Sequence, residues 1–516
     1  MEESNETQIT VDQANEPEQT SETSSLKKHC CDWRYFDGKS KAQGFACAAT
    51  GHGSLFVTNA FLSSSLIYLA SEAVGCVDEQ QDEIVDDCQE RVHGFTPSSL
   101  VTNIATIASL AAALFLPVIG AIIDYTPHRK TIGKGVALSL VIVQAVLVGT
   151  LPSTWFIMSI IQAGGIALYQ MHYSISSSYL PDIARYDVDE ETFSSFNRIF
   201  YTLQFGGEAF LLIFTVAIAT AFGLDTVQTG QLGQAFGAVW LLIAFGGAWK
   251  RFPDMPHRRP LPKGHRLVFE GFRQNMRTAK AIVKHHPTLK WFLIAVVFGE
   301  AGCSALIPII LTLLTNQLKY SATEVGISFL LSLLATLPGI ATNSILTRRL
   351  CPAKSAMVSM MGAAIVTAIA MVHIPHMPEN LYAAMGKVYC IFWGFFIGWW
   401  YASEQLLFSF LLPAGQESEL SGFYIYSMVL FTWFPPLIYS IILNQGTVNE
   451  AYGLSSLMVC QVIAFLSLGC LPPWPEALKS ASIPLVVLPP PAAVAGEEER
   501  TIQQEVVITT GESTPP

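Results

Sequence analysis

Charged residues are scarce in this chain. Lys, Arg, Asp and Glu make up 13% of its 516 residues, roughly half the share found in soluble domains. Hydrophobic residues make up 51%. Apolar runs of ~20 residues, the length that crosses a bilayer as a helix, recur along the chain. The composition excludes an ordinary soluble protein and predicts an all-α polytopic membrane protein.

Motifs for catalysis and for metal binding are missing as well. The ten cysteines include no CxxC pair, and no nucleophile, phosphate-binding or metal motif occurs with supporting context. We therefore expect no enzyme, no cofactor, no metal and no nucleic-acid partner. The net charge of −11 falls largely in the tails and one loop, so it indicates solvated ends rather than a surface for a basic partner.

The first 40 residues lack the apolar stretch of a signal peptide, so we expect the first membrane helix to direct insertion itself. Residues 1–42 are rich in Ser, Thr, Glu and Gln, and residues 472–516 contain a proline run followed by acidic residues. Both segments have the composition of disordered tails. The folded part of the chain is thus expected between them.

Twelve apolar spans are expected, with ends uncertain by several residues. They form an N-terminal half over 43–249 and a C-terminal half over 291–471, joined by a connector over 250–290. The fold class is thus an all-α polytopic membrane protein with twelve transmembrane helices in two six-helix halves. The spans are 43–70, 99–123, 132–150, 154–180, 199–222, 231–249, 291–315, 324–346, 355–374, 383–411, 422–444 and 452–471.

The positions of Lys and Arg predict the orientation. Positive residues near helix ends stay in the cytosol. With both termini cytosolic, all of the 29 Lys and Arg residues except Arg91, Lys319 and Lys387 fall on that side. The connector alone carries eleven Lys and Arg, and its stretch 268–286 has a helical composition that suits the membrane surface.

The stretch GAIIDYTPHRK, residues 120–130, forms the turn between the second and third spans. Its Asp124, followed by Arg129 and Lys130, resembles the loop signature of the major facilitator superfamily. Six helices, a basic connector and six more helices is also the layout of that superfamily. The resemblance implies two parallel halves with the substrate site between them near mid-membrane.

In the superfamily this loop latches a cytosolic gate. The chain departs from the pattern at Tyr125, where a basic residue is usual, and at Pro127, where glycine is usual. The second-half turn, Thr347-Arg348-Arg349, keeps the basic pair without an aspartate. The resemblance implies a gate that includes Asp124, Arg129, Lys130, Asp182, Arg198, Arg348 and Arg349.

A second stretch narrows the resemblance. Residues 178–184, SYLPDIA, resemble the YLPEI segment of the autophagy-related protein 22 group, which are vacuolar amino-acid effluxers, and of their bacterial relatives. The long first external loop and the Ser-Phe-Asn-Arg segment at 195–198 are similar to the same group. Sugar:cation symporters have a similar segment after their fourth span, and they remain the nearest competitor.

Five ionisable residues lie inside the expected spans, where such groups are costly and mark function. Each is about eight or nine residues from the cytosolic end of its span, which is ~12–14 Å, or near the middle of a ~30 Å core. They are His52, His172, Glu208, Glu300 and Glu404.

The two halves can be aligned on local landmarks. Gly51-His52 in the first span matches Gly299-Glu300 in the seventh. His172 and Glu404 both precede a Leu-Pro pair by the same number of residues. Each half thus offers a pair from its first and fourth helices, and we expect these four residues to surround the substrate path. A carboxyl group in low dielectric favours its protonated form, and a neighbouring histidine could relay the proton.

Other residues have both a functional and a structural interpretation. Trp400 and Tyr401, one turn before Glu404, are expected to face the cavity, whereas the other aromatic residues of that helix suit lipid or neighbouring helices. Asn59 and Asn103 are uncharged candidates for substrate contact. A buried histidine bonded to a backbone carbonyl is the structural alternative for His52 and His172.

Two cysteines, Cys76 and Cys88, share one acidic loop that the orientation places away from the cytosol. A disulfide and two free thiols are both consistent with their positions.

These patterns together predict a monomeric transporter that works by alternating access. The expected role is proton-linked efflux of neutral amino acids from a vacuole or lysosome-like compartment, with the plasma membrane as another location. The alternatives are a sugar:proton symporter and, from a different class, a membrane scaffold or receptor without transport. The expected partners are a small-molecule substrate, protons and the lipid bilayer.

Overall fold

The computed structural model describes residues 42–78, 83–84, 90–179, 190–255, 260–261, 264–412, 417–445 and 449–481. The two predicted tails lie mostly outside these ranges. The described chain is helical apart from short turns and one hairpin, β1 (Val77–Asp78) paired with β2 (Glu83–Ile84). The all-α fold class is therefore confirmed.

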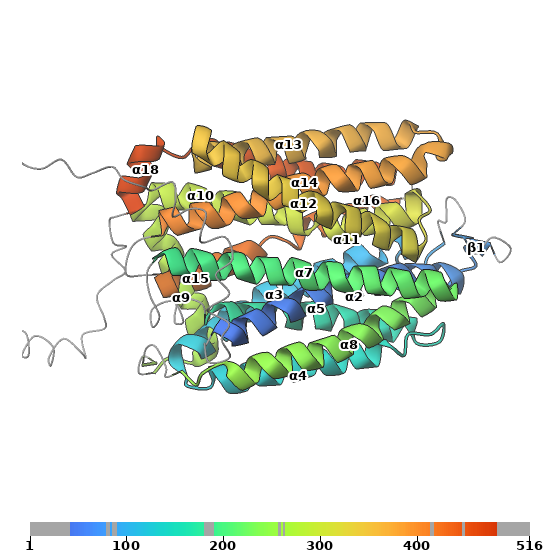
Figure 1. The fold of residues 1–516 in the computed structure, drawn as a ribbon, viewed down its shortest axis with the longest axis horizontal. Coiled ribbons are helices and arrows are strands. Elements are labelled where there is room, and N and C mark those ends of the chain that lie inside the picture. Colours follow the sequence, from blue (N-terminus) through green and yellow to red (C-terminus); the bar gives the residue numbers. More distant parts are fainter. Residues whose placement is uncertain are drawn as a thin grey trace, which may run out of the picture.

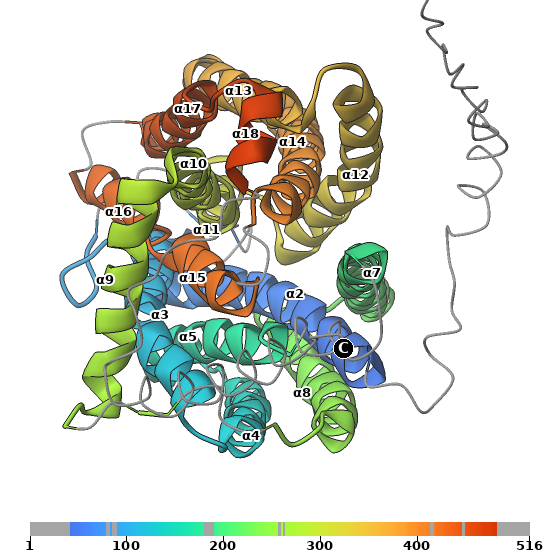
Figure 2. The same ribbon diagram turned by 90° about the vertical axis from the view of Figure 1, so that its left-hand side faces the viewer.

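The long helices form two groups that lie side by side (Figures 1 and 2). The first group contains α2 (Ala42–Ala73), α3 (Leu100–Tyr125), α4 (Arg129–Leu147), α5 (Trp155–Ser177), α7 (Glu190–Phe222) and α8 (Thr226–Arg251). The second group contains α10 (Pro287–Ser304), α11 (Leu306–Thr312), α12 (Ala322–Arg349), α13 (Pro352–His373), α14 (Tyr382–Leu411), α15 (Glu417–Val429), α16 (Phe434–Gln445) and α17 (Ser455–Gly469).

In the described chain, 11 helical segments are long and apolar enough to cross a membrane. They correspond to eleven of the twelve expected spans. The remaining span is α5, which runs through the same bundle (Figure 1) but carries several polar residues, including Gln162, Gln170 and His172, that lower its hydropathy. Gln162 and His172 are both fully buried, so these polar side chains face the interior of the molecule.

The two ends of the bundle differ. Helix α9 (Leu267–His285) and helix α18 (Trp474–Ala481) lie at one end, which we call the connector end, and the β1–β2 hairpin lies at the other, the hairpin end (Figure 1). Outward-facing side chains between the two ends are apolar, as on α3, where Ile107, Leu110 and Leu114 are all exposed. Such a surface suits contact with lipid.

Close helix packing depends on small residues. Helices α12 and α14 run against each other, and a Cβ atom at Gly394 of α14 would collide with the carbonyl oxygen of Ser332 on α12. Glycine lets the two backbones approach in this way, as is common between membrane helices. The glycines of these segments thus serve packing.

The two groups touch through polar contacts at the hairpin end. Ser440 Oγ of α16 donates a 2.6 Å hydrogen bond to Asn103 Oδ1 of α3, and the Thr96 amide donates one of 2.9 Å to Asn444 Oδ1. Asn103, a candidate for substrate contact from the sequence, is therefore engaged in holding the two groups together. Nearer the connector end, Val429 of α15 packs against Leu116 and Ala112 of α3.

Helix α9 corresponds to the helical stretch predicted in the connector. It lies across the connector end, from α3 in the first group to α10 in the second (Figure 2). One side packs on the bundle through buried Gly271, Thr278 and Ile282. The other side exposes five apolar side chains, as expected for a helix at a membrane surface: Val268, Phe269, Phe272, Met276 and Val283.

Two spans of the second group are broken. The seventh ends as α10 at Ser304, restarts as α11 at Leu306 and finishes in a π-helical turn over Leu313–Gln317. Pro308 has no N–H for the carbonyl of Ser304, which accounts for the first break. Pro435 and Pro436 have the same effect between α15 and α16. Broken helices commonly line the substrate sites of transporters.

Candidate functional site

The histidine pair lies inside the first group. His52 Nε2 of α2 and His172 Nδ1 of α5 are 2.9 Å apart, and Trp249 Nε1 of α8 donates a 2.9 Å hydrogen bond to His172 Nε2. Since His172 Nε2 accepts this bond, a neutral His172 carries its proton on Nδ1 and donates to His52. The proton of His52 is then on Nδ1, which is buried and bonds to no described residue.

The acidic pair is its counterpart in the second group. The carboxyl groups of Glu300 on α10 and Glu404 on α14 lie close enough to interact directly. Neither residue is exposed by more than 3%. Two adjacent carboxylates in a region of low dielectric repel each other strongly unless one of them carries a proton. We therefore expect the pair to hold a proton on one of its two acids.

Donors surround this acidic pair. Ser304 Oγ donates a 2.9 Å bond to Glu300 Oε2, and Trp400 Nε1 donates one of 3.3 Å to Glu300 Oε1. Tyr424 of α15 donates a 2.8 Å bond to Glu404 Oε1. The sequence interpretation missed Ser304 and Tyr424. Ser304 could have been predicted, because it follows Glu300 by one helical turn, whereas no sequence pattern marks Tyr424.

A cavity of about 350 Å³ lies between the two groups. Its wall includes Glu208 from the first group and Glu300 and Tyr401 from the second. Residues at both helix breaks also line it, among them Ser304, Pro308 and Pro436. The described residues of the wall include no Lys, Arg or His, so its formal charges are acidic.

Only some of the residues predicted to line the substrate path are part of the cavity wall. Glu208, Glu300 and Tyr401 line it, as does Asn59. His52, His172, Glu404 and Trp400 are buried but are not part of that wall. Trp400 is fully buried and faces Glu300 instead of the cavity. The four paired residues therefore lie at different distances from the substrate path, with only Glu300 at its surface.

Glu208 differs from the acidic pair in its surroundings. Its side chain is 5% exposed, and it forms no hydrogen bond or ion pair with any described residue. Tyr169 of α5 is close enough to interact with it electrostatically. The adjacent backbone of α7 lies directly against Gly53 of α2, where a Cβ atom would collide with the carbonyl oxygen of Gln204.

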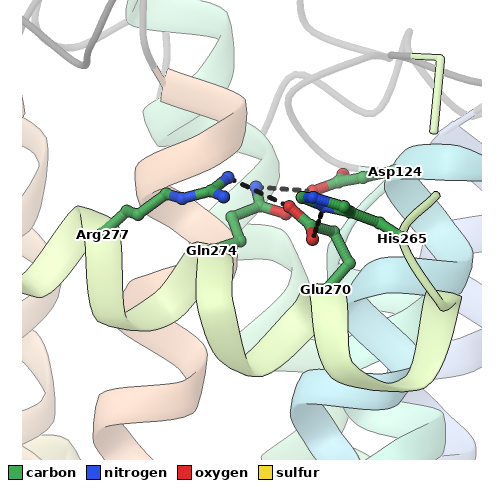
Figure 3. A network of polar contacts seen from close by, with 5 residues as sticks. All are labelled: Asp124, His265, Glu270, Gln274 and Arg277. Carbon is green, nitrogen blue, oxygen red and sulfur yellow. Dashed lines mark hydrogen bonds and ion pairs between the residues drawn. The ribbon is translucent and has the colours of Figure 1, made fainter. Parts of the chain in front are cut away.

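The predicted gate lies at the connector end. Asp124 Oδ2 accepts a 3.1 Å hydrogen bond from Gln274 of α9 (Figure 3). In the same network the buried Glu270 pairs with His265 at 2.6 Å and with Arg277 at 3.0 Å. The sequence had placed Asp124 in a latch between the halves. One of its contacts is with the connector helix, a neighbour that the loop motif alone could not identify.

The basic residues of the gate have separate surroundings. The Arg129 guanidinium lies 3.7 Å above the ring of Tyr179, and Lys130 pairs with Asp254 at 3.3 Å. Arg348 and Arg349 are exposed at the end of α12.

Three predicted residues cannot be assigned contacts. Asp182 and the side chain of Arg198 lie outside the described residues, as does Cys88. Cys76 is disulfide-bonded. Its pairing with Cys88 stays a prediction.

The described residues contain no group of three or more His, Cys, Asp or Glu side chains that could hold a metal ion.

A cavity between two groups of helices, with buried acids at its wall, is the arrangement of the major facilitator fold. Solved structures agree with this fold. A D-xylose-proton symporter matches with a TM-score of 0.58 and 11% identity over 84% of this chain and 98% of that one. The nucleoside transporter NupG matches with a TM-score of 0.54 and 12% identity over 86% of this chain and 100% of that one. The inward-open xylose transporter XylE from E. coli matches with a TM-score of 0.54 and 12% identity, over 84% of this chain and 98% of that one.

At such low identities these structures show the fold alone. The family model described as "Vacuole effluxer Atg22 like" matches residues 38–473, so the chain belongs to that family. No curated protein matches the chain. The resemblance noted at residues 178–184 is thus confirmed at the level of the family.

Proposed function

We propose that this transporter carries out proton-linked efflux of neutral amino acids from a vacuole or lysosome-like compartment by alternating access. The observation that carries the proposal is the acidic pair at the cavity. Glu300 lines the cavity, Glu404 lies next to it outside the wall, and in this proposal the two acids share a proton. A substrate at the wall can therefore influence whether the pair keeps that proton, which is the requirement for coupling the two movements.

The cavity also supports a small, partly apolar substrate. Its volume of about 350 Å³ is near the lower limit of the ~300–1,000 Å³ found for ligand pockets. Aliphatic and aromatic side chains dominate the wall, including Leu55, Phe205 and Phe329. The sugar:proton symporter is the second candidate, and the fold shared with a D-xylose-proton symporter favours it. A sugar would require a more polar wall than this one.

A scaffold or receptor without transport is the candidate from another class. Acids in a membrane core are costly and are retained for a purpose. A cavity that exposes Glu208 and Glu300 gives a scaffold no advantage. We infer from the basic connector that the connector end faces the cytosol, with both termini on that side. The family description supports the vacuolar membrane as the location.

A flux measurement tests the proposal. The full chain is reconstituted in vesicles, and uptake of leucine, xylose and a nucleoside is measured with and without a proton gradient. Leucine flux that increases with the gradient is the expected result. Flux of xylose alone would overturn the amino-acid proposal in favour of the sugar symporter. Absence of flux for every solute would favour the scaffold.

A further inference from the structure

Glu208 is the acid whose role the coupling pair does not explain. It lies on α7 in the first group, across the cavity from the second group's Glu300. Glu300 is already bonded to Ser304 and Trp400 and lies next to Glu404. Glu208 is 95% buried and has no hydrogen-bond or ion-pair partner among the described residues. A buried acid without a protein partner is costly unless something else supplies one.

The cavity indicates what that partner is. Its described wall contains two carboxyl groups and no basic side chain. A substrate carboxylate would enter without an opposite charge to stabilise it. A substrate ammonium group, in contrast, would find a carboxylate at close range. Charge-assisted hydrogen bonds of this kind are among the strongest in proteins.

Aromatic residues beside Glu208 favour the same substrate group. Tyr169 and Tyr173 of α5 and Phe205 of α7 all line the cavity. Aromatic faces attract cations, and tyrosine hydroxyls can accept hydrogen bonds from an ammonium group. This part of the wall therefore combines an acidic side chain with electron-rich rings.

We propose that Glu208 binds the amino group of the substrate, so that the transporter selects primary amines with an apolar body and does not require a carboxylate. This inference rests on the proposed function in that the substrate is an amino acid or a close analogue of one. It adds a division of roles. Glu208 on one side of the cavity binds the amine, and Glu300 with Glu404 on the other side holds the proton.

Three ligands with the same apolar side chain separate the possibilities. Leucine carries both groups, leucinamide carries the amine without a carboxylate, and N-acetylleucine carries a carboxylate without the amine. Binding to the purified full chain in detergent is measured by titration. Leucinamide is expected to bind at least as tightly as leucine, and N-acetylleucine at least tenfold more weakly. Equal or tighter binding of N-acetylleucine, or binding of none of the three, would overturn the inference.

Variants at the acid give a second test. Glu208→Gln is expected to weaken leucinamide binding at least tenfold, and Glu208→Asp to restore most of it. Glu379→Gln, at an exposed site in the loop before α14, is the matched control and should leave binding unchanged. Unaltered binding by Glu208→Gln would overturn the inference. If that variant fails to fold, the binding affinities of the three ligands for the unchanged chain still test whether the amine is the group that is recognised.

The outcomes also separate this inference from the proposed function. Leucine flux combined with equal binding of N-acetylleucine would leave the proposed function standing and remove the role of Glu208. Leucinamide binding that depends on Glu208, without leucine flux, would support the role of Glu208 and contradict the proposed function.

Discussion

Glu300 and Glu404 belong to helices far apart in sequence, yet their carboxyl groups lie next to each other. We expect one of the two acids to carry a proton. Loss of that proton would place two negative charges together in a region of low dielectric, which is strongly unfavourable. Release of the proton is therefore expected to accompany a rearrangement around the pair.

The first prediction concerns the acidic pair. In Glu404→Gln, the amide can still donate a hydrogen bond to Glu300, but the residue can no longer exchange a proton. Uptake driven by a proton gradient in vesicles is expected to fall at least tenfold, while substrate exchange without a gradient is largely retained. In the unchanged chain uptake should decline as the pH rises and the pair loses its proton, and Glu404→Gln should flatten this dependence.

The comparison for this experiment is Glu379→Gln, whose side chain is exposed. Its uptake and pH profile should match those of the unchanged chain. If Glu300→Gln and Glu404→Gln both keep an unchanged pH-dependent uptake, the pair has no part in coupling.

The second prediction concerns the histidine pair. Trp249→Phe removes the donor to His172 Nε2 and leaves a buried acceptor without its bond. An unsatisfied buried group of this kind costs about 1–3 kcal/mol. Thermal unfolding of the purified protein should therefore show a lower Tm. Trp240→Phe is a control, because Trp240 is only partly buried and donates to a backbone carbonyl. An equal Tm for Trp249→Phe and the unchanged chain would argue against this hydrogen bond.

The third prediction concerns the gate. Asp124→Asn removes the charge that strengthens the bond from Gln274, whereas Arg348 is exposed at the end of α12. Asp124→Asn should therefore alter the balance of open states more than Arg348→Gln. Two spin labels, one at the connector end of each group, would report this balance as a distance distribution. A larger shift for Arg348→Gln would assign the latch to the second group.

The fourth prediction concerns the connector helix. Glu270 is fully buried and bonds to both His265 and Arg277 (Figure 3). Glu270→Gln removes its charge and should destabilise the packing of α9 by about 1–3 kcal/mol. Hydrogen exchange in α9 should become faster, while exchange in α12 stays the same. Glu476→Gln, at an exposed site on α18, should show neither change. Unaltered exchange in Glu270→Gln would mean that apolar contacts alone hold α9.

Much of the architecture could be predicted from the sequence, because hydropathy dominates in a membrane. The positions of the apolar spans, the helical connector and the five interior ionisable residues all follow from it. The match between the two halves also paired His52 with His172 and Glu300 with Glu404, and the structure brings each pair into contact.

Which of these residues face the cavity could not be predicted. The direction of a side chain depends on how its helix is rotated and where the helix is broken. Trp400 and Tyr401 are neighbours in sequence, yet only Tyr401 lines the cavity. The contact between Asp124 and Gln274 was missed for a similar reason, since Gln274 reaches Asp124 only because α9 folds back against α3.

The break at Ser304 links the shape of the seventh span to the acid Glu300. The hydroxyl group of Ser304 is bonded to Glu300, while Pro308 leaves its carbonyl without the usual helical donor. Ser304 thus lies at the break between α10 and α11 and also donates a hydrogen bond to Glu300. A change of charge on Glu300 is therefore expected to alter the geometry at this break and, through it, the orientation of α11.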